Sequence, residues 1–146
     1  MTVRITIDSS FFVSLFLERD ENHKKAVEIF REIALKDYAK TTSYLALPEV
    51  VGAIRRRTGS INMAHMVEET LKSWAEGLIT FEELENDRIF SAVETAVRLG
   101  VRGSDAIFVS LAKEADSKFL TFDEEIKRKA KNNVKFFRIG GPERHI

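Results

Sequence analysis

The sequence predicts an α/β fold with a central, mostly parallel sheet flanked by helices. Short segments rich in β-branched and aromatic residues alternate with longer segments of helical periodicity along the whole chain. The 146 residues are 44% hydrophobic and 32% charged, which is typical of a folded domain. We find no linker, repeat or low-complexity segment, so we expect one domain over residues 1–146.

The N-terminal segment predicts a strand, a turn and two helices. Residues 3–7 alternate in polarity and are β-branched at four of five positions, which is typical of a strand. The Asp-Ser-Ser sequence at 8–10 favours a turn or a helix cap. The apolar run 11–17 then predicts a buried helix or turn, and the 3.6-residue period of apolar residues over 26–34 predicts an amphipathic helix.

A strand and a longer helix follow. Residues 38–42 form a short strand candidate, and Ser43 is expected to cap a helix that runs to Thr58 and stops at Gly59. Pro48 lies inside this helix or close to its start. Because proline within a helix costs about 3 kcal/mol, we expect an irregular or kinked first turn.

The next two helices are bounded by residues that start or stop helices. The first covers residues 61–76 and ends at Gly77, and 78–84 is a strand candidate. The second runs to residue 99, with Asn86 as its expected N-cap and Gly100 as its stop.

The C-terminal third repeats the alternation. Ser104 is expected to cap a helix that reaches about residue 115. A strand at 118–122, a basic amphipathic helix at 123–132 and a last strand at 134–139 complete the predicted fold.

Charge and composition exclude several classes of protein. The chain has 23 basic and 23 acidic side chains, so binding of nucleic acid through bulk charge is not expected, although a local basic patch is compatible with it. The absence of cysteine excludes disulfides, thiolate chemistry and cysteine-based zinc sites. Without a signal peptide or a membrane-spanning run, we expect a cytoplasmic protein. The absence of glutamine, with abundant Lys and Glu, indicates a thermophile.

Four acidic residues follow predicted strands or begin predicted helices. Asp8 and Asp123 follow strands, whereas Glu49 and Asp105 lie near helix starts. Ligands of parallel α/β sheets bind beyond the carboxyl ends of the strands, so these acids are expected to meet on one rim. Converging carboxylates need compensating charge, and Mg²⁺ or Mn²⁺ prefers such oxygen ligands.

Each acid taken alone has a structural explanation as well. Asp8 can start a turn, Asp105 can interact with a helix dipole, and Asp123 can act as an N-cap. Glu49 can form an ion pair with an arginine.

Four segments resemble the motifs of a known family in the family's order. They read IDSSFFVSLFLERDENH, LPEVVGAIRRR, GSDAIFVSLAKE and FLTFDEEI. They are similar to the motifs of PIN-domain ribonucleases, in particular the VapC-type toxins of prokaryotic toxin–antitoxin pairs. Pro48, directly before the glutamate, departs from the family pattern.

The resemblance implies a PIN-like three-layer α/β/α fold with an acidic metal site. Asp8, Glu49, Asp105 and Asp123 would form this site, with Asp8 and Asp105 as the firmest Mg²⁺ (or Mn²⁺) ligands. Ser10 and Thr121 match polar positions of the motifs and are expected to orient ligands or water, although a hydroxyl that only satisfies the core is the alternative.

The resemblance also implies a substrate and protein partners. The expected activity is metal-dependent hydrolysis of RNA phosphodiester bonds, which leaves a 5′ phosphate and a 3′ hydroxyl. Possible RNA contacts are Arg55, Arg56, Arg57, Arg102 and Lys127, of which the helical cations can also be plain solvated charges. The helices at 11–17 and 43–58 are expected to carry exposed apolar residues that form a homodimer and a groove for an antitoxin.

Two other functions are compatible with the sequence. The chain can be a housekeeping PIN nuclease in RNA processing, without an antitoxin. It can also be a non-catalytic interaction module that keeps the fold, although acids at all four motif positions argue against this.

Overall fold

A five-stranded parallel sheet forms the centre of the molecule. In the computed structural model, which describes residues 2–138, the strand order is β3-β2-β1-β4-β5 and all four pairings are parallel. The strands are β1 (Arg4–Ile7), β2 (Ala39–Ser43), β3 (Thr80–Glu82), β4 (Lys118–Leu120) and β5 (Lys135–Phe136). Among the described residues, no helix is long and apolar enough to cross a membrane.

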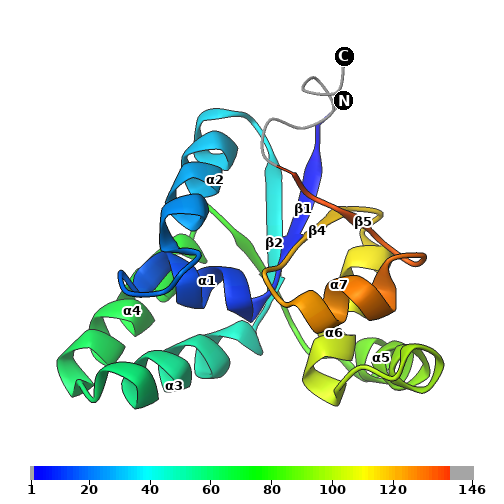
Figure 1. Cartoon of the computed structure of the whole chain (residues 1–146). Helices are drawn as coiled ribbons and strands as arrows, with labels where there is room; N and C mark the ends of the chain where they lie inside the picture. The colour runs from blue at the N-terminus through cyan, green and yellow to red at the C-terminus, as the bar shows by residue number, and fades with distance from the viewer. Residues whose placement is uncertain (1, 139–146) are drawn as a thin grey trace.

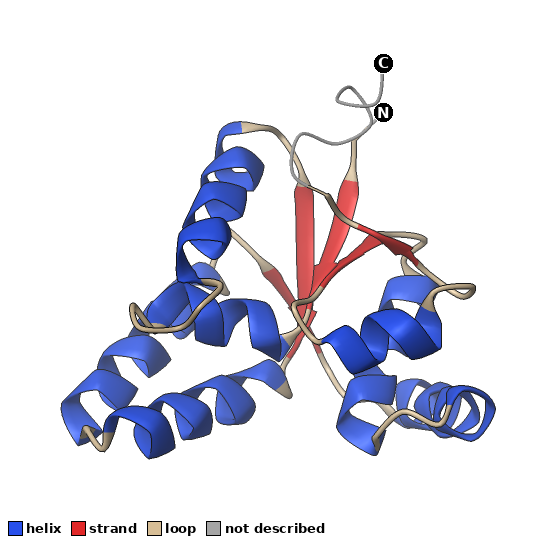
Figure 2. Cartoon of the chain, in the orientation of Figure 1, coloured by secondary structure: helices blue, strands red, loops and turns tan. Residues whose placement is uncertain are grey.

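Helices cover both faces of the sheet, which confirms the predicted three-layer α/β/α fold. Helices α1 to α4 lie on one side and α5 to α7 on the other (Figure 1), and the strands run between the two groups (Figure 2). The helices are α1 (Ser9–Phe16), α2 (His23–Leu35), α3 (Ala46–Thr58), α4 (Ile61–Trp74), α5 (Asn86–Leu99), α6 (Gly103–Glu114) and α7 (Glu124–Ala130).

The central strand β1 is buried on both faces because helices cover both sides of the sheet (Figure 1). Ile5 and Ile7 of β1 have no exposed surface, and Thr6 between them bonds the hydroxyl of Ser117 at 2.5 Å. The core on the α1 side is aromatic, with Trp74 stacked on Phe16 and Phe30 at ring-centroid distances of 5.4 and 4.9 Å.

Three predicted helix starts were wrong by a few residues. Ser43 ends β2 instead of capping α3, because it pairs with Glu82 of β3, and its hydroxyl accepts the Leu45 N–H at 3.1 Å. Helix α5 has Glu85, not Asn86, at its N-cap, and α6 has Arg102, not Ser104. Neither of these caps makes a side-chain cap bond, so local capping signals alone did not set the boundaries.

Pro48 causes no break in α3. It is the third residue of the helix, where a backbone N–H would have no intrahelical acceptor, so the missing donor costs nothing there. The last strand is shorter than predicted, because β5 covers Lys135–Phe136 only. Residue 139 of the predicted strand lies outside the described residues.

Candidate active site

Parallel pairing of the two central strands brings two motif residues together. Ile7 of β1 is level with Leu120 of β4, so the next residues, Asp8 and Thr121, leave the sheet side by side. The Asp8 N–H donates to the Leu120 carbonyl at 3.1 Å, which extends the pairing by one residue. Asp8 therefore stands at the carboxyl edge of the sheet, where α/β proteins bind ligands.

The Asp8 carboxylate is buried and receives several hydrogen bonds. Its Oδ1 accepts from the Ser10 hydroxyl at 2.7 Å and from the N–H groups of Ser10 and Phe11 at 3.0 and 3.4 Å. Its Oδ2 accepts from the Thr121 hydroxyl at 2.7 Å. Asp8 thus caps α1, and the hydroxyls of Ser10 and Thr121 fix its orientation.

Burial raises the pKa of Asp8 from 3.8 to about 6, although its hydrogen bonds act in the opposite direction. The negative charge of Asp105 raises this pKa further. The side chain is 3% exposed, so its charge is poorly solvated. An ionised Asp8 therefore favours a nearby cation.

Asp105 and Asp123 share a single arginine. The Arg102 Nε lies 3.1 Å from Asp105 Oδ2, and its Nη2 lies 3.6 Å from Asp123 Oδ2. Burial raises the pKa of Asp105, as do the charges of Asp123 and Glu125, whereas Arg102 lowers it. Arg102 itself is largely exposed, with 72% of its side chain accessible, so it can leave without disturbing the core.

Two helix starts fix the positions of these acids. Asp105 lies in the first turn of α6, and Asp123 is the N-cap of α7, where its Oδ1 accepts the Ile126 N–H at 3.0 Å. The N-terminus of a helix favours negative charge, so the capping role of Asp123 is compatible with a place among the acids of the site.

Glu49 is linked to the residue that follows Asp8, a serine that the motifs did not single out. The Ser9 hydroxyl donates to Glu49 Oε1 at 2.6 Å, and Ser9 directly follows Asp8. The two serines after Asp8 could have indicated this contact in the sequence, but only Ser10 was predicted to orient ligands or water. The contact ties the first turns of α1 and α3 together next to the acids.

The chemistry of these side chains fits a hard divalent cation, but their arrangement is not a closed ligand set. Carboxylate oxygens suit Mg²⁺ or Mn²⁺, and the raised pKa values of Asp8 and Asp105 reflect buried negative charge. However, within residues 2–138 no three Asp, Glu or His side chains are close enough to hold one ion as they stand. Arg102 neutralises Asp105 and Asp123 in this arrangement.

The candidate RNA-binding cations divide into two groups. Arg102 touches the acids directly. The arginines at 55–57 form the last turn of α3, at the opposite end from Glu49, and Arg57 contacts Asp20 at 3.4 Å. Lys127 contacts Glu124 of its own helix at 3.4 Å.

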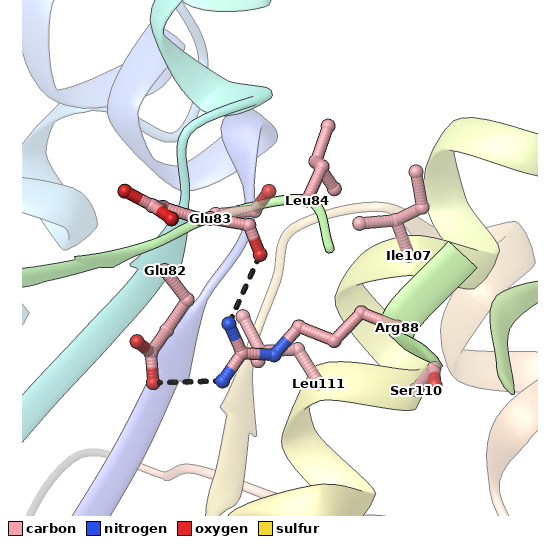
Figure 3. A pocket seen from close by; sticks show the side chains of 8 residues that line it. Glu82, Glu83, Leu84, Arg88, Ile107, Ser110 and Leu111 are labelled. Carbon is pink, nitrogen blue, oxygen red and sulfur yellow. Dashed lines mark hydrogen bonds and ion pairs between the residues drawn. The ribbon is translucent and has the colours of Figure 1, made fainter. Parts of the chain in front are cut away.

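A small pocket beside Arg88 is too small for a nucleotide. It has a volume of about 10 Å³, which is room for about one water. In Figure 3, the Arg88 side chain points at Glu82 and at the backbone of Glu83, and the contacts are 3.4 and 3.0 Å long. The pocket therefore lies at a structural junction between α5 and the end of β3.

A parallel α/β sheet with carboxylates gathered at the carboxyl ends of its strands defines the class of this protein. Within that class, the chain belongs to the PIN domain family, whose family model matches residues 5–132. This confirms the family predicted from the four motifs. No curated protein matches the chain in sequence.

Several solved structures share this fold, and some of them are described as a toxin or a toxin–antitoxin complex. The Mycobacterium tuberculosis VapC20, described as a sarcin-ricin loop cleaving toxin, is 21% identical with a TM-score of 0.76, over 92% of this chain and 98% of that one. VapBC-1 from nontypeable Haemophilus influenzae is 11% identical with a TM-score of 0.65, over 92% and 97%. VapBC2 from Rickettsia felis, bound to a promoter DNA fragment, is 12% identical with a TM-score of 0.63, over 92% and 98%.

Proposed function

We propose that this protein is a divalent-metal-dependent endoribonuclease and the toxin of a toxin–antitoxin pair. The observation that carries the proposal is the buried Asp8 carboxylate, held at the carboxyl edge of the sheet and electrostatically coupled to Asp105. Membership of the PIN domain family and the fold shared with VapC toxins support it.

In this proposal Asp8, Asp105, Asp123 and Glu49 hold Mg²⁺ or Mn²⁺, directly or through water. The ion would supply the positive charge that activates water toward phosphorus and stabilises the departing oxygen. Ser10 and Thr121 keep the Asp8 oxygens in place, and Ser9 does the same for Glu49. Arg102 contacts both Asp105 and Asp123, and with these carboxylates bound to an ion its exposed guanidinium would be available to contact an RNA phosphate.

Cleavage of pooled tRNA and rRNA fragments tests the nuclease. We expect the wild type to cut with Mn²⁺ or Mg²⁺, to leave 5′ phosphates and to stop when EDTA is added. Asp105→Asn is expected to abolish cleavage. Asp87→Asn is the matched control, because Asp87 lies in the first turn of α5 just as Asp105 lies in the first turn of α6. Cleavage by Asp105→Asn at the wild-type rate would refute the acidic site.

Arg55, Arg56, Arg57 and Lys127 belong to the proposal as further phosphate contacts. The arginines are exposed on the last turn of the helix that carries Glu49, so they can meet RNA that extends from the site. Their loss is expected to weaken RNA binding without stopping cleavage.

The proposal includes an antitoxin and a homodimer, but the exposed apolar surface differs from the one expected. No large apolar side chain of α1 or α3 is exposed. Phe11, Phe12 and Val13 of α1 are buried, because that helix packs into the core between α2 and α3. Helix α5 instead exposes four apolar residues, Ile89, Phe90, Val93 and Val97.

Helix α5 is therefore the proposed place of contact between two copies of this chain, because dimer formation there would bury these four apolar side chains. Light scattering of the purified protein tests the dimer, and Val93→Glu is expected to give a monomer if α5 lies in the interface. A wild type that is monomeric at micromolar concentration would refute the dimer.

A housekeeping nuclease and a non-catalytic module are the alternatives. A protein that binds no Mn²⁺ would favour the module. Cleavage without a neighbouring antitoxin gene would favour the housekeeping nuclease.

A further inference from the structure

A wide basic hollow lies at the edge of the sheet opposite to the acids. It has a volume of about 1150 Å³ and is lined where β1, β4 and β5 begin and where α6 and α7 end. We define the basic hollow by its five cationic residues, which are Arg4, Lys113, Lys118, Lys131 and Lys135. Asp116 is the one acidic residue among the lining residues. In a chain of zero net charge, this is a strong local concentration of positive charge.

The lysines of the basic hollow have no structural partner to account for them. Within residues 2–138, none of the four forms an ion pair, whereas Lys72, Lys127 and Lys129 do. Lys118 and Lys135 are register partners on adjacent strands, so two like charges stand next to each other. Lys113 and Lys131 lie at the C-terminal ends of helices, where cations are favourable, but that explanation does not cover the strand pair.

The lining favours a phosphate backbone over a protein surface. Its apolar members, Val3, Ala112 and Val134, are small, and none is exposed. Protein interfaces bury large apolar or aromatic anchors, which are absent among these lining residues. Lysine ammonium groups around an open hollow are instead typical contacts for phosphates.

Two helices connect the basic hollow to the acids. Helix α6 begins next to Arg102 and Asp105 and ends at the basic hollow, and α7 runs from Asp123 to Lys131. Both lie on the same side of the sheet (Figure 1). The 12 residues of α6 span about 18 Å. A stacked strand advances about 3.4 Å per nucleotide, so this length corresponds to about five nucleotides.

We propose that the basic hollow is a second contact site for the RNA backbone, which holds substrate that extends about five nucleotides from the acidic site. This inference rests on the proposed nuclease function. It predicts that the hollow contributes to RNA affinity and its salt dependence, while the acids carry the cleavage.

The salt dependence of RNA binding tests this proposal. Binding of a fluorescent 12-nucleotide oligouridylate is measured by anisotropy in EDTA, for the wild type and for Lys118→Gln/Lys135→Gln. The control is Lys24→Gln/Lys25→Gln, which removes the same charge from two exposed lysines of α2. We expect the slope of log K against log salt to become shallower by about 1.4 in the hollow variant and to stay unchanged in the control.

Equal slopes for all three proteins would overturn the proposal. An equal decrease of the slope in the hollow variant and in the control would also overturn it. Oligoglutamate of matched charge tests a protein partner. Loss of its binding in the hollow variant, with an unchanged oligouridylate slope, would also overturn the RNA assignment.

A crosslinking experiment keeps the proposal testable if the double variant does not fold. The sequence has no cysteine, so Lys135→Cys provides one thiol for a photo-crosslinker. We expect crosslinks to oligouridylate from this position and not from Lys24→Cys, and the reverse result would overturn the proposal. Both measurements are made without divalent ions, so they are independent of cleavage. If the wild type cleaves RNA but the hollow variant has an unchanged slope, only the RNA-binding role of the basic hollow is refuted. If the slope changes but the wild type does not cleave RNA, only the nuclease function is refuted.

Discussion

The guanidinium of Arg102 lies 3.1 Å from the carboxylate of Asp105, in contact with one of the acids proposed to hold a metal ion. The same guanidinium extends to Asp123 at 3.6 Å. Arg102 therefore supplies the positive charge that an ion would otherwise supply to these two carboxylates. Arg102 should therefore have two opposing effects. It neutralises the two carboxylates, and it would compete with a metal ion for them.

Removal of Arg102 is expected to strengthen metal binding. Exposed ion pairs contribute about 0.2–1 kcal/mol, so Arg102→Ala should tighten Mn²⁺ binding by about 1.4- to fivefold in calorimetry. Lys127→Ala is the control, because it removes an equal charge whose contact is with Glu124 instead. Weaker Mn²⁺ binding by Arg102→Ala would mean that the arginine supports the ion and does not compete with it.

Ser9 is expected to position Glu49 for activity. Ser9→Ala removes the 2.6 Å hydrogen bond to Glu49, and loss of such a supporting contact lowers metal affinity or activity by about 10- to 100-fold. Ser14→Ala is a matched control on the same helix, because the Ser14 hydroxyl donates to Asp20 at 2.8 Å, away from the acids. We expect Ser14→Ala to lower the melting temperature and keep the cleavage rate, and a similar fall in rate for both variants would contradict the positioning role.

The sequence predicted the fold because its periodicities are strong. The alternation of strand and helix patterns needed no tertiary information, and parallel pairing then placed Asp8 and Thr121 together. The helix starts were harder to predict, since Ser43 is held in β2 by its pairing with Glu82, a residue far away in sequence.

The exposed apolar surface was not predictable in the same way. Helices α1 and α5 both contain apolar residues at helical spacing, and only their packing shows that Phe11 and Phe12 are buried whereas Phe90 and Val97 are exposed. The contacts of Arg102 with Asp105 and Asp123 likewise depend on how α6 and α7 begin, so the sequence could suggest the arginine but not its partners.

Arg88 is expected to stabilise the α5 side of the molecule. Its guanidinium contacts Glu114 at 3.0 Å, Glu82 at 3.4 Å and Glu85 at 3.6 Å, and only 22% of its side chain is exposed. Arg88→Ala leaves three carboxylates without their shared cation. Hydrogen bonds to charged groups contribute about 1.5–3 kcal/mol, so the free energy of unfolding in urea should fall by about 2 kcal/mol. Arg98→Ala, on the exposed last turn of the same helix, should change it by less than about 0.5 kcal/mol, and equal effects would contradict a specific role for Arg88.

Replacement of Asp8 by asparagine is expected to stabilise the metal-free protein at neutral pH. The pKa of Asp8 is raised to about 6 by burial, so between about pH 4 and pH 6 the folded state binds more protons than the unfolded state. Stability therefore falls as the pH rises through this window, by on the order of 3 kcal/mol from this group alone. Asparagine carries no charge and keeps an oxygen for the N–H groups of Ser10 and Phe11. In urea unfolding with EDTA, the free energy of unfolding of Asp8→Asn should thus increase relative to that of the wild type between pH 4 and pH 7.

Asp20 provides a control of opposite sign for this pH dependence. Burial acts to raise the pKa of Asp20, but the hydrogen bonds from Asn22 and Ser14 and the charge of Arg57 lower it overall. Its stabilising effect is therefore present at neutral pH and is lost as the pH falls through its folded pKa. Asp20→Asn should destabilise the protein at pH 7 and approach the wild type in acid. A flat difference between Asp8→Asn and the wild type across pH 4 to 7 would mean that the Asp8 carboxylate ionises normally in the folded protein, and the electrostatic basis for a cation site there would be lost.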